Sequence, residues 1–301
     1  MNTVYTKGVM KNVFKLFDKI IDKVKGASKS KAAQSTRCNS KGGTPVEIKI
    51  GHCARPADFE FVERNRFHSG IQGVERFYST ERPDTEEEIC GDTVTWCSLP
   101  GNGKALVLSD GMGKGKEAAF SSHKTVIKLR SFLKDGFPPK EALKEVNDFI
   151  IRQKAKQILN EDDFATIDLA VVDGKRGRAL FYKMGAAVSF VVRGEKVLKI
   201  HQSTLPAGII PEIDIRPATA SIAPGDMIVM VSDGVAEADR ADFTGGWLTD
   251  FLIYEGKKVK QGSEKRPRIV ATEILNMAAE KNCGHEADDM TVLVAIVIPV
   301  K

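Results

Sequence analysis

The sequence predicts an α+β domain in which a few long helices cover mainly antiparallel sheets. Three pairs of strand-like segments are each joined by a short turn, and such short connections require antiparallel pairing. Two further runs, 227–231 and 291–298, are almost wholly apolar and are expected to be central strands buried on both faces. Helical segments interrupt the strands, which completes the α+β pattern.

The strand pairs are recognised by alternating apolar residues and by the turns between them. Each turn is short and contains glycine, and the pairs are 93–99 with 104–109, 165–172 with 178–184, and 189–192 with 196–200. An earlier strand is expected at 46–50, where apolar and polar residues alternate. Residues 54–90 are polar and highly charged, and we expect them to be irregular.

Three helices are expected from apolar residues at helical spacing, at 117–133, 139–157 and 267–281. The last two begin with proline, which is well suited to the first turn of a helix because its missing N–H would be unpaired there in any case. No repeat of the length typical of solenoid proteins is present.

The basic charge of the chain is concentrated in an N-terminal arm. Residues 1–45 hold ten lysines and arginines but two acidic residues, so the remaining chain is slightly acidic although the net charge is +5. We expect residues 1–25 to form a basic amphipathic helix, 26–45 a flexible linker, and 46–301 the main domain. Self-association, partner docking and weak membrane adsorption through residues 4–25 are left open. A nucleic-acid surface on the acidic main domain is not expected.

The composition also bears on the compartment. No apolar run reaches the length of about eighteen residues that spans a bilayer, and the lysine-interrupted N-terminus does not resemble a secretory signal. The five cysteines contain no C-x-x-C pair, which favours free thiols in a reducing compartment over a zinc site. The sequence therefore predicts a cytoplasmic protein.

Acidic residues occur repeatedly where predicted strands begin or end. Ser-Asp-Gly follows two apolar runs, at 109–111 and 232–234. Asp92 opens the strand that begins at residue 93, and Asp288 and Asp289 precede the run at 291–298. Because the end of one antiparallel strand lies beside the start of its neighbour, these carboxylates are expected to converge at one edge of the sheets.

Converging carboxylates repel one another strongly and are usually held together by cations. Oxygen ligands alone favour hard ions, so the sequence predicts two Mg²⁺ or Mn²⁺ ions at this edge. Two such ions activate a water for in-line attack on phosphorus, with no need for a side-chain nucleophile. The glycine at position 111 would let its own carbonyl group face an ion.

The glycine-rich run at 111–116 permits another reading, a nucleotide-binding loop. It follows a strand and precedes a helix, as phosphate-binding loops do. It matches neither G-x-x-x-x-G-K-[ST] nor G-x-G-x-x-G, however. We therefore expect a loop beside the metal site, with Lys114 and Lys116 in solvent rather than on phosphate.

The chain resembles the metal-dependent protein phosphatases of the PPM type, and within them the bacterial branch typified by stage II sporulation protein E. The matching segments lie in the family order across roughly residues 46–299: Cys90–Asp92, Ser109–Gly113, Phe164–Asp168, Lys183–Ala187, Leu205–Ile209, Gly225–Asp226, Ser232–Gly234 and Asp288–Val292. Each segment is weakly specific by itself, whereas the ordered set is highly specific.

This resemblance implies a β-sandwich of two mainly antiparallel sheets flanked by helices, with the metals at one edge. It also implies that Asp110 bridges both ions, that the Gly111 carbonyl binds one, and that Asp233 and Asp288 bind the other. Asp92 would hold water of the metal shell or an outer ion, and Asp289 would support the ligands from behind.

The implied activity is hydrolysis of phosphoserine or phosphothreonine on a regulatory protein, in an enzyme that takes part in signal transduction. The sequence departs from the family pattern at Cys90, Val188 and Lys114, but it keeps every metal carboxylate. A non-catalytic module with the same fold, sensing metal or a partner, is the alternative. A phosphatase acting on small molecules also remains open.

Overall fold

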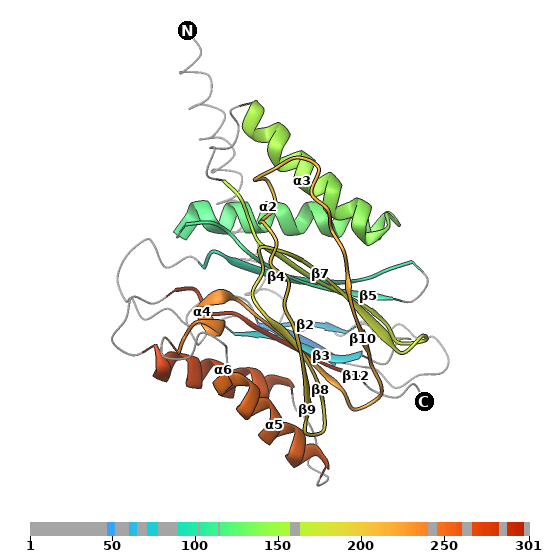
Figure 1. Cartoon of the computed structure of the whole chain (residues 1–301), viewed down its shortest axis with the longest axis vertical. Helices are drawn as coiled ribbons and strands as arrows, with labels where there is room; N and C mark the ends of the chain where they lie inside the picture. The colour runs from blue at the N-terminus through green and yellow to red at the C-terminus, as the bar shows by residue number, and fades with distance from the viewer. Residues whose placement is uncertain are drawn as a thin grey trace, which may run out of the picture.

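Two five-stranded antiparallel sheets lie face to face in the computed structural model, and helices cover both outer sides (Figure 1). The structure describes residues 47–51, 60–64, 71–77, 90–100, 103–113, 115–156, 163–239, 246–260, 267–282 and 288–297. The predicted N-terminal helix and linker, up to residue 45, lie outside these residues. The β-sandwich flanked by helices is therefore confirmed.

The first sheet has the strand order β10-β7-β6-β5-β4. All of its pairs are antiparallel, and its strands are β4 (Asp92–Ser98), β5 (Lys104–Asp110), β6 (Ile167–Asp173), β7 (Arg178–Met184) and β10 (Ala218–Ser221). Its outer side is covered by α2 (Gly115–Lys134) and α3 (Pro139–Ala155), which lie above the sheet in Figure 1. The predicted hairpins at 93–109 and 165–184 are thus confirmed with small shifts of their ends.

The second sheet has the order β3-β12-β11-β8-β9, again with antiparallel pairs throughout. Its strands are β3 (Ile71–Phe77), β8 (Ser189–Arg193), β9 (Lys196–Ile200), β11 (Met227–Val231) and β12 (Val292–Val297). The two apolar runs, β11 and β12, are central in this sheet and buried at every position, as predicted. The outer side carries α4 (Asp233–Ala236), α5 (Gly246–Lys260) and α6 (Pro267–Lys281).

Burial divides the apolar side chains into three layers. One lies between the sheets and includes Leu106, Phe181 and Met230; the second lies between the first sheet and α2 and α3; the third lies between the second sheet and α5 and α6. Since neighbouring side chains of a strand point to opposite faces, strands with apolar residues on both faces contribute to two layers at once. The sheets are therefore fixed from both sides.

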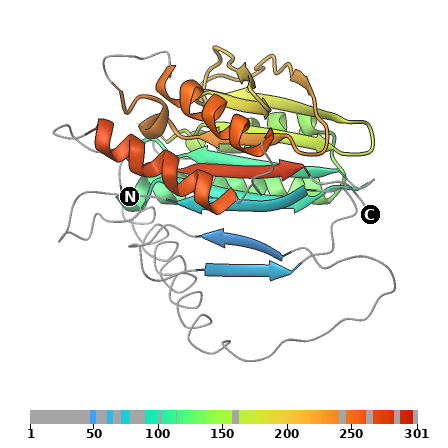
Figure 2. The same cartoon turned by 90° about the horizontal axis from the view of Figure 1, so that it is seen from below.

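The expectation of irregular structure at 54–90 is wrong for part of that segment. It contains β2 (Glu60–Arg64), which pairs with β1 (Glu47–Gly51) as a separate two-stranded ribbon (Figure 2), and the edge strand β3. β3 forms because it adds to the free edge of β12, with a register shift at Ala295 and Ile296. This pairing comes from the partner strand, so the polar local pattern does not indicate it.

Helix α5 was not predicted, although its sequence carries a signal for it. Trp247, Leu248, Phe251 and Leu252 recur at the spacing of one helical face and pack in the layer beneath the second sheet. Cys90 and Cys97 are both buried, and Cys97 is a free thiol, as expected. No helix within the described segments is long and apolar enough to cross a membrane.

The inter-sheet core predicts a large loss of stability on truncation of Phe181, which is fully buried there. Phe181→Ala is expected to lower the free energy of unfolding by about 3–5 kcal/mol, because it removes buried apolar surface and leaves a cavity. Urea unfolding measures the change. Leu198→Ala, at a side chain that is 48% exposed on β9, should change it by less than about 0.5 kcal/mol; equal losses would contradict this account of the core.

Candidate metal centre

Asp92 and Asp110 face each other at one end of the first sheet. They are direct partners in the antiparallel register of β4 and β5, where Asp92 opens one strand and Asp110 closes the other. Both share the strand face of residues such as Trp96 and Leu106, which points toward the second sheet. Asp92 is buried, with 2% of its surface exposed. The first sheet therefore places two carboxylates side by side at its inner edge.

The second sheet brings Asp233 and Asp288 to the corresponding end. Asp233 follows β11 and Asp288 precedes β12, and these strands are paired up to Val231 and Val292. The pairing continues one residue further, since the Ser232 N–H donates to the Thr291 carbonyl at 3.0 Å and the Thr291 N–H donates to Ser232 Oγ at 2.9 Å. The serine of the second Ser-Asp-Gly thus joins the two acidic segments.

The two acidic edges meet across the sandwich. The Gly91 N–H, next to Asp92, donates to Asp289 Oδ2 at 2.5 Å. The pKa of Asp110 is raised to about 9, first by burial and then by the charges of Asp92, Asp233, Asp288 and Asp289. These charges belong to both acidic edges, so each of the predicted carboxylates acts on the titration of Asp110.

The pKa of Asp233 is also raised, but by less than that of Asp110. Its pKa is raised to about 6 by burial and by the charge of Asp288, while the Gly234 N–H lowers it. Like charges that are out of water disfavour a second ionisation, which is the expected behaviour of such a group. Among the described residues, no three or more Asp, Glu, His or Cys side chains are arranged as a group that could hold a metal ion. The assignment of individual ligands is for this reason a proposal.

Both Ser-Asp-Gly glycines are required by close backbone contacts. A Cβ on Gly111 would lie 1.9 Å from the carbonyl oxygen of Ala118 in α2, and one on Gly234 would lie 2.4 Å from the carbonyl oxygen of Asp289. No side chain fits at such distances. The glycines therefore allow α2 and the segment before β12 to pack directly against the two Ser-Asp-Gly turns. The sequence did not reveal this role.

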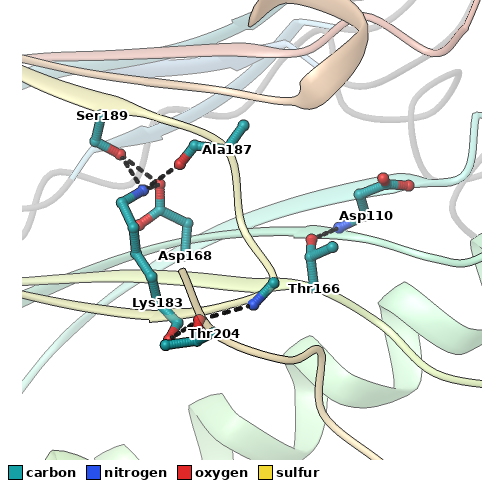
Figure 3. Close-up of polar contacts among 8 residues, drawn as sticks. Asp110, Thr166, Asp168, Lys183, Ala187, Ser189 and Thr204 are labelled. Atoms are coloured by element: carbon teal, nitrogen blue, oxygen red, sulfur yellow. Dashed lines mark hydrogen bonds and ion pairs between the residues drawn. The ribbon is translucent and has the colours of Figure 1, made fainter. Parts of the chain in front are cut away.

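Thr166 supports Asp110 from the neighbouring strand (Figure 3). The Asp110 N–H donates to Thr166 Oγ1 at 2.9 Å, and the Thr166 N–H donates to the Asp110 carbonyl at 2.8 Å. Ser109 Oγ donates to the Thr166 carbonyl at 2.6 Å. Thr166 belongs to one of the segments that carry the family resemblance, but sequence reasoning assigned it no role. Only the strand pairing shows that it holds the backbone of Asp110.

A loop between β9 and β10 completes this edge. Ala207 forms a β-bridge to Ala165, and Ala165 forms another to Gly111. The loop is therefore separated from the turn at Asp110 and Gly111 by one intervening backbone segment. Asn147 of α3 anchors it through both amide atoms, accepting from the Gly208 N–H at 2.8 Å and donating to the Ile210 carbonyl at 2.9 Å. Lys116 is exposed, as expected, whereas Lys114 lies outside the described residues.

Comparison with solved structures defines the class of protein. The PP2C phosphatase domain of the cell fate determinant SpoIIE from Bacillus subtilis, solved with a fragment of its regulatory domain, matches with a TM-score of 0.64 and 26% identity, over 77% of this chain and 64% of that chain. The described residues accordingly form a phosphatase domain of the PP2C type.

Sequence comparison defines the family. The model of the Stage II sporulation protein E (SpoIIE) family matches residues 100–297, and the chain belongs to this family. Stage II sporulation protein E of Bacillus subtilis (strain 168) is 30% identical over 206 residues, and that of Priestia megaterium is 31% identical over 207. These alignments cover 68% and 69% of this chain but 24% and 34% of the relatives, so the chain spans about a quarter to a third of their length.

The raised pKa of Asp110 predicts that the metal-free protein becomes less stable as the pH rises. The folded state holds this proton up to about pH 9, whereas the unfolded chain releases it near the ordinary value of 3.8. The unfolded state therefore binds fewer protons between these limits, and stability falls with increasing pH.

Asp110→Asn removes this titration while keeping the shape of the side chain. In the presence of a chelator, the variant should gain stability over the wild type as the pH is raised from about 5 to 9, measured by urea unfolding. Asp250→Asn, at an exposed position of α5, serves as the control and should follow the wild type. A constant difference between Asp110→Asn and the wild type would contradict the assigned pKa.

Proposed function

We propose that this chain is a metal-dependent phosphatase that hydrolyses phosphoserine or phosphothreonine on a regulatory protein, with water activated by two Mn²⁺ or Mg²⁺ ions. The observation that carries the proposal is the gathering of four carboxylates around Asp110, whose pKa is raised to about 9 by its own burial and by their charges. Membership of the SpoIIE family and the PP2C-type fold support the same conclusion.

The residues at this edge fit divalent cations by their chemistry. The described groups whose charges shift the pKa of Asp110 are all carboxylates, and oxygen ligands of this kind favour Mg²⁺ or Mn²⁺ over Zn²⁺. A carboxylate whose pKa is raised by its neighbours gains most from a cation, because the cation removes the repulsion that keeps it protonated.

Each acidic residue has a proposed role that follows from its position. Asp110 lies between the two sheets and is influenced by the carboxylates of both, so it would bridge the two ions. The Gly111 carbonyl would bind one ion, and Asp233 and Asp288 the other. Asp92, directly across from Asp110, would orient water or hold an outer ion. Asp289 accepts the Gly91 N–H, so it would position the turn that carries Asp92.

The chemistry needs no side-chain nucleophile. When bound, the ions would lower the pKa of water and neutralise charge on the phosphoryl oxygens. The protein would contribute the carboxylates that hold them, fixed in place by the Thr166 and Ser232 hydrogen bonds. Phosphate is the group that the centre has to recognise, and the family supports a protein as its carrier.

Removal of Asp110 or of the metal is expected to abolish the activity. Asp110→Asn should lower Mn²⁺-dependent hydrolysis of an aryl phosphate and of a phosphoserine protein at least about 100-fold, because the bridging charge is lost. A chelator should stop the wild-type reaction, and added Mn²⁺ should restore it. Phosphate release measures the rate.

Asp250→Asn again provides the control, since it removes an exposed carboxylate in the second turn of α5 that is not among the charges acting on Asp110, and it should leave the rate unchanged. Turnover that ignores the chelator would refute the metal-dependent mechanism. Mn²⁺ binding without turnover on any phosphate ester would favour the non-catalytic module instead.

A further inference from the structure

A second charged cluster is buried between the two sheets, on the strands that follow Thr166 (Figure 3). Its members are Asp168 of β6, Lys183 of β7 and Ser189 of β8, each at most 1% exposed. Asp168 and Lys183 are register partners within the first sheet, whereas Ser189 is the first residue of β8 in the second sheet. The cluster therefore spans the sandwich at the point where the chain passes from one sheet to the other.

The Lys183 ammonium group has three hydrogen-bond partners on three different segments. It donates to Asp168 Oδ2 at 2.7 Å, to Ser189 Oγ at 2.9 Å and to the carbonyl oxygen of Ala187 in the crossing loop. Ser189 Oγ also donates to Asp168 Oδ2. An ammonium group has three N–H donors, and here each of them has an acceptor. The three hydrogen bonds therefore restrain the position of the Lys183 nitrogen from three sides.

Stability alone does not account for this cluster. The second oxygen of the carboxylate, Asp168 Oδ1, is buried and has no hydrogen-bond partner among the residues that the structure describes. A buried ion pair is at best weakly stabilising compared with apolar residues of similar size, and an unsatisfied oxygen makes it less so. A specific geometrical role is the remaining explanation.

The cluster is connected to both halves of the candidate metal centre. On the first sheet, Asp168 lies two residues after Thr166, which holds the backbone of Asp110 at 2.9 Å. On the second sheet, Ser189 is the register partner of Met230 in β11, and Asp233 follows the end of that strand. Asp168 is thus connected through Thr166 to Asp110, and Ser189 is connected through β11 to Asp233.

The same end of β7 also holds the loop beside Gly111. Thr204 Oγ1 donates to the Lys183 carbonyl at 2.9 Å and accepts the Gly185 N–H at 3.1 Å (Figure 3). Three residues further, Ala207 bridges to Ala165, the neighbour of Gly111. Lys183 therefore contacts β6 through Asp168, β8 through Ser189 and the loop after β9 through Thr204.

We propose that Lys183, with Asp168 and Ser189, is a positioning group that sets the separation and lateral register of the two sheets for divalent-metal binding. This inference rests on the proposed function, since it assumes that carboxylates of both sheets share the ions. The hydrogen bonds of this one ammonium group add directional restraints between the sheets to those of apolar packing, which has no preferred direction. A shift of a few tenths of an ångström suffices to disturb octahedral Mg²⁺ coordination, whose distances are about 2.0–2.1 Å.

The test separates positioning from stability. The variant Asp168→Leu/Lys183→Met removes both charges together, so it avoids a buried charge without its partner and should keep a wild-type midpoint in urea. Mn²⁺ binding is titrated directly, by the electron paramagnetic resonance signal of the free ion. We expect the dissociation constant to rise about tenfold or more, as it does when groups behind metal ligands are lost. The Mn²⁺ concentration for half-maximal phosphatase activity should rise by the same factor.

Ser189→Ala is the second variant, and it decides the question if the double variant does not fold. It removes the hydrogen bonds of the Ser189 hydroxyl, which link the cluster to the second sheet, but keeps the Lys183–Asp168 ion pair within the first. The change deletes one hydroxyl group, so its effect on folding should be small. A weaker Mn²⁺ affinity is expected here too, with a smaller change than in the double variant.

Arg193→Met is the matched control. Arg193 donates to the buried Asp226 at 2.6 Å at the other end of β8, away from the acidic turns. It should lose stability yet bind Mn²⁺ as the wild type does. Wild-type affinity in the folded double variant or in Ser189→Ala would overturn the inference alone. A wild-type protein that binds no Mn²⁺ would overturn the proposed function, and the inference with it.

Discussion

The repulsion among the carboxylates at one end of the sandwich is the constraint on which the rest of the structure depends. Burial and four neighbouring aspartates raise the pKa of Asp110 to about 9, which means that its ionised form is strongly disfavoured without a cation. A fold that gathers such groups needs a rigid frame on every side. The two sheets, the two closely packed glycine turns and the covering helices form that frame.

The frame divides the acidic residues between two independent sheets. Asp92 and Asp110 come from β4 and β5, while Asp233 and Asp288 adjoin β11 and β12. Within each sheet, backbone hydrogen bonds determine the spacing of the pair. Between the sheets, most contacts are apolar, so the relative placement of the two halves depends on packing and on the few polar groups that cross the interior. The arrangement of the acidic edge is thus a property of the whole sandwich.

The elements that the sequence predicted well are those whose own residues determine them. The hairpins, the two central strands and the proline-initiated α3 and α6 have strong local patterns, and they are present with ends shifted by a few residues at most. The polar strand β3 was missed because its partner β12 creates it. The helix α5 was missed although its apolar residues recur at helical spacing, so here the pattern was available and was not used.

The sequence by itself determined which residues can make a metal centre: aspartates at strand ends, each followed or preceded by an apolar strand that must be buried. That follows from the alternation and hydrophobicity of the strands, which are local properties. The tertiary structure alone decided how those aspartates act on one another, why Gly111 and Gly234 admit no side chain, and that Lys183 joins the two sheets. These features depend on contacts between residues far apart in the chain, and no local pattern records such contacts.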